Sequence, residues 1–293
     1  VIVGAFQGVT ELFPVSSLGH SILVPALIGG QWARDLNVSA PQSPYLAFIV
    51  GLHVATAAAL LVFFWRDWLR VLAGFASSVR HRRIHTPDER LAWLIVAATI
   101  PVGLAGLGLE QLFRTTLGKP IPAAVFLILN GITLYAAEVL RRRTVPAATA
   151  PTEDQPAHSD EAIDDRLAQL PMAQGVLIGS AQILALLPGI SRSGIAMVAG
   201  LWRGLSHEDA ARFSFLLATP IILAAGVYKI PELFGPLGAG IGGQVLAGSI
   251  ASFVCAYLAV RYLTRYFQTR TLTPFAIYCA LAGAGSLAWL TLR

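Results

Sequence analysis

Two polar stretches interrupt this otherwise apolar chain: Glu11-Leu-Phe-Pro-Val-Ser-Ser-Leu-Gly-His20 and Leu187-Pro-Gly-Ile-Ser-Arg-Ser-Gly194. Each stretch places proline, glycine, serine and ionisable side chains inside a run that is typical of a membrane-embedded segment. Broken backbone and charge at membrane depth are tolerated only where they are buried in protein or line a cavity. The two stretches, one in each half of the chain, therefore predict where the functional site lies.

The composition is that of a polytopic membrane protein. Hydrophobic residues make up 55% of the 293 residues, charged residues make up 13%, and the mean hydropathy is +0.66. A soluble domain carries about 25% charged residues. The net charge of +5 does not indicate nucleic-acid binding, because the arginines cluster beside hydrophobic segments, as orientation signals do. Cys255 and Cys279 lie within apolar runs and are expected to be small core residues.

The apolar runs predict six spanning helices and two shorter, broken elements. A spanning helix needs about 20 apolar residues. The six candidates are residues 44–65, 91–109, 121–140, 211–230, 239–260 and 272–291. The stretches 1–29 and 172–203 contain the polar breaks, and each half of them is too short to span. They are therefore expected to be re-entrant helix–loop–helix elements of an all-α membrane protein.

The elements come in the same order in both halves of the chain. A first repeat, 1–140, and a second, 171–293, each contain one re-entrant element followed by three spans, and a polar linker, 141–170, joins them. Because three crossings is an odd number, the second half enters the membrane from the opposite side. This predicts inverted-topology repeats within a single membrane domain. The two re-entrant loops then dip in from opposite faces, and their tips can meet near the midplane.

The basic residues favour one orientation of this arrangement. If residues 66–90 are cytoplasmic, the same side holds 141–170, 203–212 and 261–270, where most of the arginines lie. The opposite side then holds only the following basic residues: Arg34, Arg114, Lys119, Lys229 and Arg293. This distribution agrees with the positive-inside rule.

The second break has the chemistry of a phosphate-binding cradle. The guanidinium of Arg192 is always charged, and its fork matches phosphate oxygens. Gly189 and Gly194 allow the backbone to approach a ligand closely. Ser191 and Ser193 add hydroxyls, and the helix that begins near Gly194 aims N–H groups at an anion. The alternative is an internal ion pair in which Arg192 holds two helices together.

The first break supplies groups for acid–base chemistry. Glu11 and His20 flank Ser16 and Ser17. Histidine titrates near neutrality and suits general acid–base catalysis. Three roles are open for Glu11: orienting the histidine, acting as a base, or holding a divalent cation together with phosphate oxygens. Gln7 lies one helical turn before Glu11 on the same face. Its amide either forms a hydrogen bond to the ligand or to a metal-bound water, or packs one helix against another.

Structural roles are the alternatives for several of these residues. A buried ion pair between Glu11 and Arg192 is one, and it does not exclude catalysis. Backbone hydrogen bonding is the commoner role of a serine in a membrane loop, and it is sufficient for Ser16 and Ser193. His53 stands alone in an apolar helix and is expected to be a core residue.

Both polar stretches resemble motifs of one known family. Gln7-Gly-Val-Thr-Glu11-Leu-Phe-Pro-Val-Ser-Ser-Leu-Gly-His20 resembles the (E/Q)xxxE and PVSSxGH signature of bacterial undecaprenyl-diphosphate phosphatases of the bacitracin-resistance type. Pro188-Gly-Ile-Ser-Arg-Ser-Gly194 resembles the PGxSRSG motif of the same family. The two motifs stand in the right order in an integral membrane chain, and the resemblance covers the whole chain.

The resemblance implies a multi-pass enzyme of the bacterial plasma membrane. It would hydrolyse undecaprenyl diphosphate to undecaprenyl phosphate and phosphate, which recycles the lipid carrier of cell-wall synthesis. The resemblance also implies a divalent cation, Mg²⁺ or Ca²⁺, held by Glu11 with Gln7, and a site that opens to the outer face. The implied catalytic residues are Glu11, Ser17, His20, Ser191 and Arg192. The implied substrate-binding residues are Gln7, Ser16, Gly189, Ser193 and Gly194.

Two positions depart from the family pattern. Gln7 stands where many members have glutamate, which removes one potential ligand charge for a metal. Ala196 stands two positions after the SRSG element, where the family usually has threonine. A missing phosphate contact at this position would weaken the activity or change the prenyl substrate.

Several alternatives remain open. The attacking group is either Ser17, helped by His20, or a water activated by Glu11 and His20. A transporter or flippase for a lipid phosphate or anion is the main rival, because inverted repeats with broken helices are common in transporters. An acid-phosphatase-type lipid phosphatase is weaker, because no upstream Lys/Arg-Pro motif or downstream His-Asp pair accompanies the serine motif. A second copy of the chain, forming a homodimer, is a further open partner.

Overall fold

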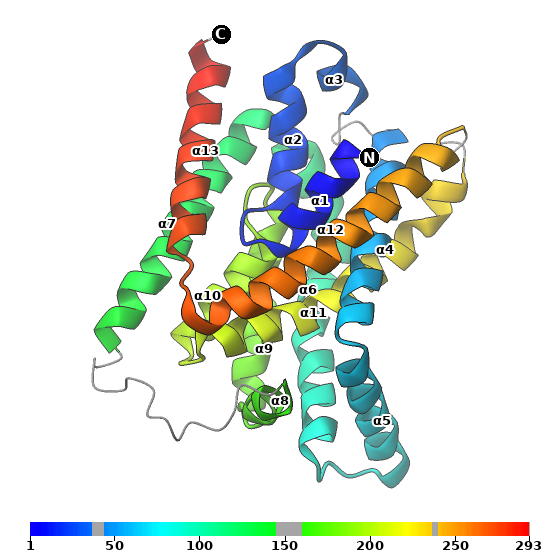
Figure 1. Cartoon of the computed structure of the whole chain (residues 1–293), viewed down its shortest axis with the longest axis vertical. Coiled ribbons are helices and arrows are strands. Elements are labelled where there is room, and N and C mark those ends of the chain that lie inside the picture. Colours follow the sequence, from blue (N-terminus) through cyan, green and yellow to red (C-terminus); the bar gives the residue numbers. More distant parts are fainter. Residues whose placement is uncertain (37–43, 145–159, 236–239, 293) are drawn as a thin grey trace.

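The computed structural model describes residues 1–36, 44–144, 160–235 and 240–292. These ranges contain helices and no strand, which confirms the all-α prediction (Figure 1). The first half forms α1 (Ile2–Leu12), α2 (Ser17–Ile28), α3 (Gly30–Asp35), α4 (Pro44–Phe63), α5 (Trp65–His81), α6 (Pro87–Leu117) and α7 (Pro120–Thr144). The second half forms α8 (Asp160–Ala168), α9 (Met172–Ala181), the 3₁₀ helix η1 (Gln182–Leu186), α10 (Arg192–Trp202), α11 (His207–Phe234), α12 (Gly242–Thr269) and α13 (Thr273–Leu292).

Long apolar helices make this chain a multi-pass membrane protein. Within the described ranges, α6, α7, α11, α12 and α13 are each long and apolar enough to cross a membrane. The remaining predicted span, 44–65, corresponds to α4, which the chain leaves through an 86° bend into α5. A second bend, of 105°, separates α8 from the α9–η1 segment. Each of the six predicted spans therefore corresponds to a helix, although residue 239, at the start of the span 239–260, lies outside the described residues. The α4 helix is the one that continues into a bent partner.

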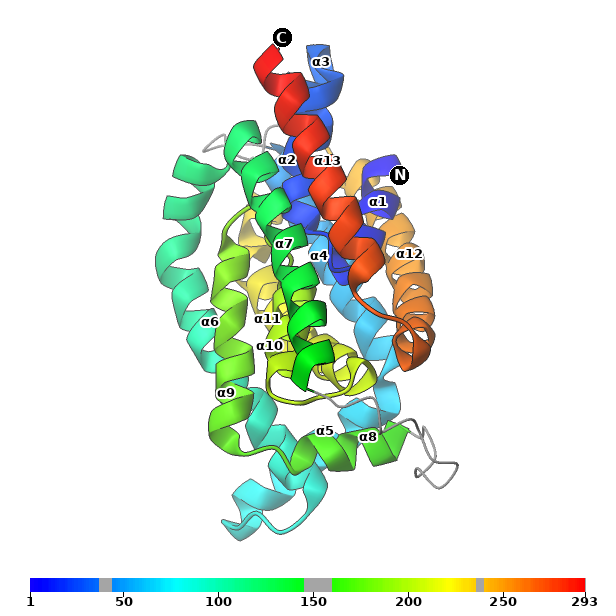
Figure 2. The ribbon, with the colours of Figure 1, turned by 90° about the vertical axis from the view of Figure 1, so that its left-hand side faces the viewer.

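Both predicted re-entrant elements are helix–break–helix structures. Residues 1–29 form α1 and α2, and residues 172–203 form α9, η1 and α10. The V formed by α1 and α2 opens toward the end of the molecule where α3 lies (Figures 1 and 2). The α9 helix rises from the other end of the molecule, where α5 and α8 lie (Figures 1 and 2). This placement agrees with entry from opposite faces, and the inverted repeat remains a prediction.

Small residues let the helix before each break pack closely on the other half of the chain. A Cβ atom on Gly8 of α1 would clash with the carbonyl of Ser252 in α12, and one on Gly179 of α9 would clash with the carbonyl of Ala98 in α6. Lipid tails are as apolar as side chains, so helices in a membrane associate through close contacts of this kind. The contacts are reciprocal: α1 of the first half packs against α12 of the second half, and α9 of the second half packs against α6 of the first.

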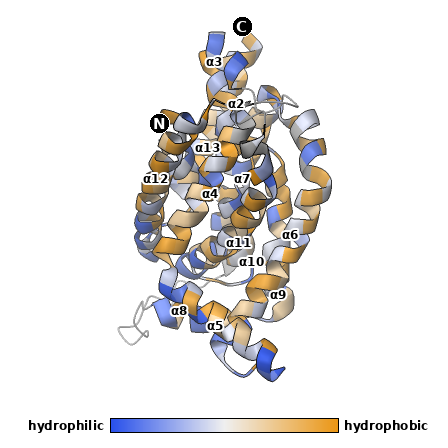
Figure 3. Ribbon diagram, turned by 90° about the vertical axis from the view of Figure 1, so that its right-hand side faces the viewer, coloured by the Kyte–Doolittle hydropathy of each residue, from blue (hydrophilic) through white to orange (hydrophobic). Residues whose placement is uncertain are grey.

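Ion pairs fasten the helices at the arginine-rich end. Arg212 of α11 is only 3% exposed. Its guanidinium lies 2.6 Å from carboxylate oxygens of Asp164 and Asp160 in α8, and 3.1 Å from Asp67 in α5. Two of these carboxylates, those of Asp67 and Asp164, are buried and also pair with Arg70, at 2.7 Å and 2.8 Å. Hydrophilic residues gather here around α5 and α8, and at the opposite end around α3 (Figure 3).

Helices occupy both ends of the predicted linker, 141–170. The α7 helix continues to Thr144, and α8 occupies Asp160–Ala168. The part between them, 145–159, lies outside the described residues. The α8 segment is helical because it packs against α6 and α11 and its carboxylates meet Arg212. Cys255 and Cys279 are both free, as expected for small residues in apolar helices.

We expect Gly179→Ala to lower the free energy of unfolding by about 1–3 kcal/mol, because the added methyl has to push α9 away from α6. Gly8→Ala should act in the same way between α1 and α12. Gly103→Ala in α6 is the matched control, since nothing lies within 4 Å of an added Cβ atom there. Thermal unfolding in detergent measures all three, and equal midpoints would contradict the packing argument.

Candidate active site

The first break begins where α1 ends at Leu12. Phe13 is extended, with φ −66° and ψ 144°, as is usual for a residue before proline. Ser16 adopts φ 68°, which is uncommon for a residue other than glycine. Its hydroxyl accepts a hydrogen bond from the Gly19 N–H at 3.3 Å and caps α2. Ser16 therefore has the backbone role that was the alternative at this position, and Ser17 becomes the first residue of α2.

The second break has the same three features as the first: an extended residue before a proline, a residue with positive φ, and a serine that caps the next helix. Leu187 is extended before Pro188. Gly189 adopts φ +120°, and a Cβ atom there would clash with the carbonyl of Ala123 in α7. The hydroxyl of Ser191 accepts a hydrogen bond from the Gly194 N–H at 3.2 Å and caps α10. The cap makes Arg192 the first residue of α10.

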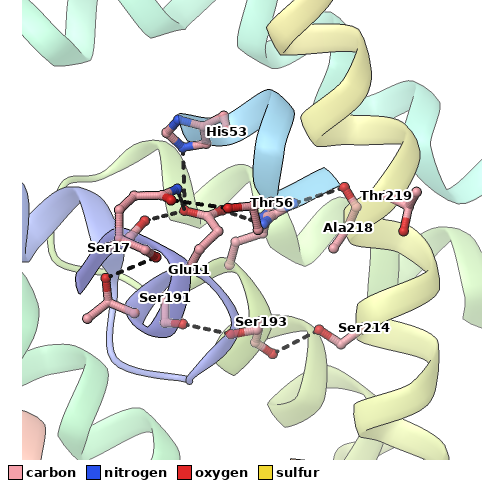
Figure 4. A network of polar contacts seen from close by, with 12 residues as sticks. Glu11, Ser17, His53, Thr56, Ser191, Ser193, Ser214, Ala218 and Thr219 are labelled. Atoms are coloured by element: carbon pink, nitrogen blue, oxygen red, sulfur yellow. Dashed lines mark hydrogen bonds and ion pairs between the residues drawn. The ribbon is translucent and has the colours of Figure 1, made fainter. Parts of the chain in front are cut away.

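The tips of the two breaks are in contact. Ser193 Oγ donates to the carbonyl oxygen of Phe13 at 3.2 Å. A Cβ atom on Gly19 would lie 2.9 Å from the Cα of Gly189, so the two loops touch through glycine. Residues 180 positions apart in the chain therefore share one site, as the opposite entry of the two elements predicts (Figure 4).

An ion pair between Glu11 and Arg192 joins the two breaks. Arg192 Nη2 lies 2.5 Å from Glu11 Oε1. The Glu11 side chain is 7% exposed and the Arg192 side chain 14%, so the pair is largely shielded. Arg192 Nη1 also donates to the carbonyl oxygen of Ala218 in α11, at 3.2 Å. The ion pair that the sequence left as an alternative is thus present, and it places the guanidinium beside the carboxylate.

Ser17 is hydrogen-bonded to the same carboxylate. Its hydroxyl donates to Glu11 Oε2, the oxygen that does not face Arg192 (Figure 4). A carboxylate that accepts a hydrogen bond from a serine hydroxyl is in the position of a general base for that hydroxyl. Glu11 is therefore placed to take the proton of Ser17.

His53 is a site residue that the sequence did not reveal. It is expected to be a core residue, but its Nε2 lies 3.4 Å from Glu11 Oε2 and its Nδ1 lies 2.9 Å from the carbonyl oxygen of Ile49. The side chain is 32% exposed, and its ring points toward the Glu11 carboxylate (Figure 4). The available signal was an ionisable residue in the middle of a spanning helix, which often marks a function.

His20 lies apart from Glu11 and Ser17. Its Nδ1 is 2.7 Å from the carbonyl oxygen of Ser16, and its Nε2 is 2.8 Å from the hydroxyl of Tyr278 in α13. Because Nδ1 faces a carbonyl, it carries the hydrogen, and neutral Nε2 accepts from the tyrosine. The described contacts do not join His20 to the Glu11–Ser17 pair, and Tyr278 is a partner that the sequence did not suggest.

Gln7 is held by two other helices. Its Oε1 accepts hydrogen bonds from Ser252 at 2.6 Å and from Thr56 at 3.1 Å. Its Nε2 lies 3.5 Å from Glu11 Oε2. The amide nitrogen, rather than the oxygen, therefore faces the carboxylate, and this arrangement does not present Gln7 as a cation ligand.

The oxygen donors of the site fit a divalent cation only if a ligand shares it. Glu11 is the carboxylate at the junction, and the described residues hold no group of three or more His, Cys, Asp or Glu that could bind a metal alone. Mg²⁺ is commonly held by one or two carboxylates together with phosphate oxygens of a substrate. The residues present fit such a shared cation.

The arrangement combines an anion-binding end with an activated hydroxyl. Arg192 stands at the N-terminus of α10, where backbone N–H groups and the helix dipole favour an anion. The adjacent hydroxyls of Ser191 and Ser193 lie 3.1 Å apart, and Ser214 of α11 donates to the Ser193 carbonyl. Among the residues proposed from the sequence, the structure brings together Glu11, Ser17, Ser191, Arg192 and Ser193, with Gln7 beside them. These groups suit phosphoryl transfer to an oxygen nucleophile.

Known proteins match this chain along its whole length. The model of a family described as bacitracin resistance protein BacA matches residues 1–285. An undecaprenyl-diphosphatase of Mycolicibacterium paratuberculosis is 83% identical, over 100% of this chain and 97% of that protein. Undecaprenyl-diphosphatase 1 of Frankia casuarinae is 50% identical, over 97% of this chain and 95% of that protein. Undecaprenyl-diphosphatase 2 of Chromobacterium violaceum is 41% identical, over 98% and 96%.

We expect Glu11→Gln and Arg192→Gln each to lower the free energy of unfolding by about 3 kcal/mol, because each leaves a shielded charge without its partner. The double variant should lose less than the sum of the two, because neither charge is then left alone. A double-mutant cycle of reversible unfolding in mixed micelles measures the coupling. Strictly additive losses would show that the two side chains are not coupled.

Proposed function

This chain belongs to the BacA family of bacitracin resistance proteins, and we propose that it hydrolyses undecaprenyl diphosphate to undecaprenyl phosphate and phosphate. The observation that carries the proposal is the meeting of the two breaks. One carboxylate, Glu11, accepts from the Ser17 hydroxyl and pairs with Arg192. Relatives that carry the name undecaprenyl-diphosphatase match the full chain, and the enzyme sits in the bacterial membrane as a multi-pass protein.

Arg192 is the proposed anchor of the terminal phosphate. Its fork binds phosphate oxygens in bidentate fashion, and the first turn of α10 adds N–H groups. The hydroxyls of Ser191 and Ser193 border the same turn. A diphosphate that binds here competes with Glu11 for the guanidinium, because both are anions. Substrate binding therefore loosens Glu11 from Arg192 and leaves the carboxylate with Ser17.

Ser17 is the proposed nucleophile. Its oxygen attacks the terminal phosphorus, its proton passes to Glu11, and the bond from that phosphorus to the bridging oxygen breaks. Undecaprenyl phosphate leaves with the proton that Glu11 passes to its oxygen, so Glu11 is again a carboxylate. Glu11 then takes a proton from the water that attacks the phosphoserine, and the bond from phosphorus to the Ser17 oxygen breaks. Glu11 returns this proton to the Ser17 oxygen as phosphate is released. The geometry supports Glu11 rather than His20 as the base, since the carboxylate accepts from Ser17 and the imidazole lies against Tyr278.

A shared divalent cation completes the proposal. Mg²⁺ or Ca²⁺ would be held by Glu11 and by oxygens of the diphosphate, since the described residues offer no larger ligand set. When bound, the cation neutralises part of the negative charge of the diphosphate. The protein itself supplies further positive charge through Arg192, at the N-terminus of α10.

Two finer proposals concern access and association. We propose that the site opens to the outer face, because α1 and α2 reach it from the end with α3, opposite the arginine-rich end (Figure 1). We also propose that two copies of the chain associate. Labelling with a membrane-impermeant reagent tests the first, and the mass of the protein–detergent complex tests the second.

The transporter alternative is not favoured. Relatives with 83% identity are named as phosphatases. A pure anion carrier needs the guanidinium and glycines of the second break, but it has no use for a hydroxyl bonded to a carboxylate. The pairing of Ser17 with Glu11 is therefore the feature that separates the two functions.

We expect Arg192→Ala and Glu11→Gln to lower kcat/KM for undecaprenyl diphosphate by at least about 100-fold, since each removes a charge that acts on the reacting phosphate. Phosphate release by purified protein in detergent measures this without any gradient. Thr116→Ala is the control, because this exposed hydroxyl bonds, within the described part of the chain, to the Leu112 carbonyl of its own helix. Unchanged rates in both site variants would refute the assignment.

We expect acid quenching during turnover to trap a phosphate on Ser17 when the terminal phosphate of the substrate is radiolabelled. Ser17→Ala should carry no label and should lose turnover, because the attacking oxygen is gone. Mass spectrometry of the labelled peptide locates the phosphate. Full turnover by Ser17→Ala would rule out the covalent route and leave an activated water as the nucleophile.

A further inference from the structure

We propose that Asn130 of α7 is a positioning residue, whose side-chain amide holds the two breaks in the register that phosphoryl transfer requires. Asn130 Nδ2 donates to the carbonyl oxygen of Pro14 at 3.0 Å. Asn130 Oδ1 accepts from the N–H of Ser191, also at 3.0 Å. One planar group thus bonds to both breaks, and the residue is only 2% exposed. The proposal deepens the proposed function and rests on it.

Each break leaves one buried backbone group without a partner in a helix, and the Asn130 amide bonds to both groups. The Pro14 carbonyl lies just after the end of α1, and the Ser191 N–H lies just before α10, so neither has a partner within a helix. A buried backbone group without a hydrogen bond costs stability, and at membrane depth there is no bulk water to replace the partner. Asn130 supplies the donor for one and the acceptor for the other.

Only a side chain with one donor and one acceptor side by side fits this position. A methyl or an alkyl side chain would leave the Ser191 N–H unpaired and would leave the Pro14 carbonyl with only the Cys279 thiol, at 3.8 Å, among the described contacts. An ionised carboxylate would accept from Ser191 but would repel the carbonyl of Pro14. The remaining hydrogen of the Asn130 amide is also used, since Nδ2 lies 3.3 Å from Cys279 Sγ in α13. The contacts fix the orientation of the amide, because exchanging its oxygen and nitrogen would break both backbone bonds.

The bridge acts on the chemistry because of what each break carries. Pro14 lies three residues after Glu11 and three before Ser17, and Ser191 is adjacent to Arg192. The amide therefore fixes the hydroxyl and its base relative to the guanidinium that anchors the phosphate. A misplacement of about 1 Å between reacting groups can cost about 100-fold in rate. Losing the bridge should slow the chemical step more than it weakens binding, because Arg192 and α10 remain.

The test compares Asn130→Ala and Asn130→Asp with Thr133→Ala. Thr133 lies on the same helix, is partly exposed, and among the described residues its hydroxyl bonds to the Leu129 carbonyl of its own helix, so its variant controls for a change in α7 itself. Steady-state phosphate release from undecaprenyl diphosphate gives kcat and KM for each purified variant. Amide hydrogen exchange of the peptide that covers residues 187–194 reports the bridge without any substrate.

For Asn130→Ala we expect kcat to fall about 10- to 100-fold while KM changes less than about threefold. Hydrogen exchange at 187–194 should be faster than in the wild type, and Thr133→Ala should match the wild type in every measurement. In Asn130→Asp, the neutral carboxyl again offers one donor and one acceptor. Its kcat relative to wild type should therefore fall as the pH rises, whereas Asn130→Ala should show no such dependence.

Three results would overturn the proposal. One is a folded Asn130→Ala whose kcat stays within about twofold of wild type. Another is a loss of activity in Asn130→Ala that matches the loss of folded protein in thermal unfolding. The third is unchanged exchange at 187–194 in both Asn130 variants. If wild-type protein releases no phosphate, the proposed function fails, and the exchange experiment still decides whether the bridge exists.

Discussion

Backbone groups that a helix leaves unpaired cannot face lipid, and this constraint shapes the centre of the molecule. Each polar break ends one helix and begins another, so each exposes N–H and C=O groups at membrane depth. The two breaks satisfy each other and are sealed by α7. Ser193 donates to Phe13, and caps by Ser16 and Ser191 close the helix starts. The site is thus formed by the same contacts that make the broken backbone tolerable.

Charge in this setting follows the same constraint. An isolated guanidinium or carboxylate away from water is costly, whereas the pair formed by Arg192 and Glu11 is close to neutral. In the proposed mechanism, an incoming diphosphate offers Arg192 a replacement anion, so the guanidinium keeps a partner. The exchange leaves Glu11 next to Ser17 and His53. In the proposed mechanism, Glu11 therefore has two roles: it pairs with Arg192 before substrate binds, and it accepts the proton of Ser17 afterwards.

The sequence was sufficient for the parts of the fold that depend on chain-local chemistry. Apolar runs gave the spans, and proline, glycine and serine marked both breaks. The meeting of the two breaks also followed, because two elements that enter from opposite faces meet at their tips, whereas the pairing of Glu11 with Arg192 was only one of the alternatives. The partners of His20, His53 and Asn130 did not follow. They depend on how a spanning helix is rotated about its own axis, and a uniformly apolar run carries no signal for that rotation.

The exchange of helices between halves also has a consequence for how the protein is made. The surface that receives α1 belongs to α12, which leaves the ribosome more than 200 residues later. In a partly synthesised chain, α1 therefore lacks its main packing partner and contacts only first-half helices such as α2 and α4. The two breaks can meet only after α10 has been synthesised, and α1 gains its packing surface only after α12, so the site is completed late in biosynthesis.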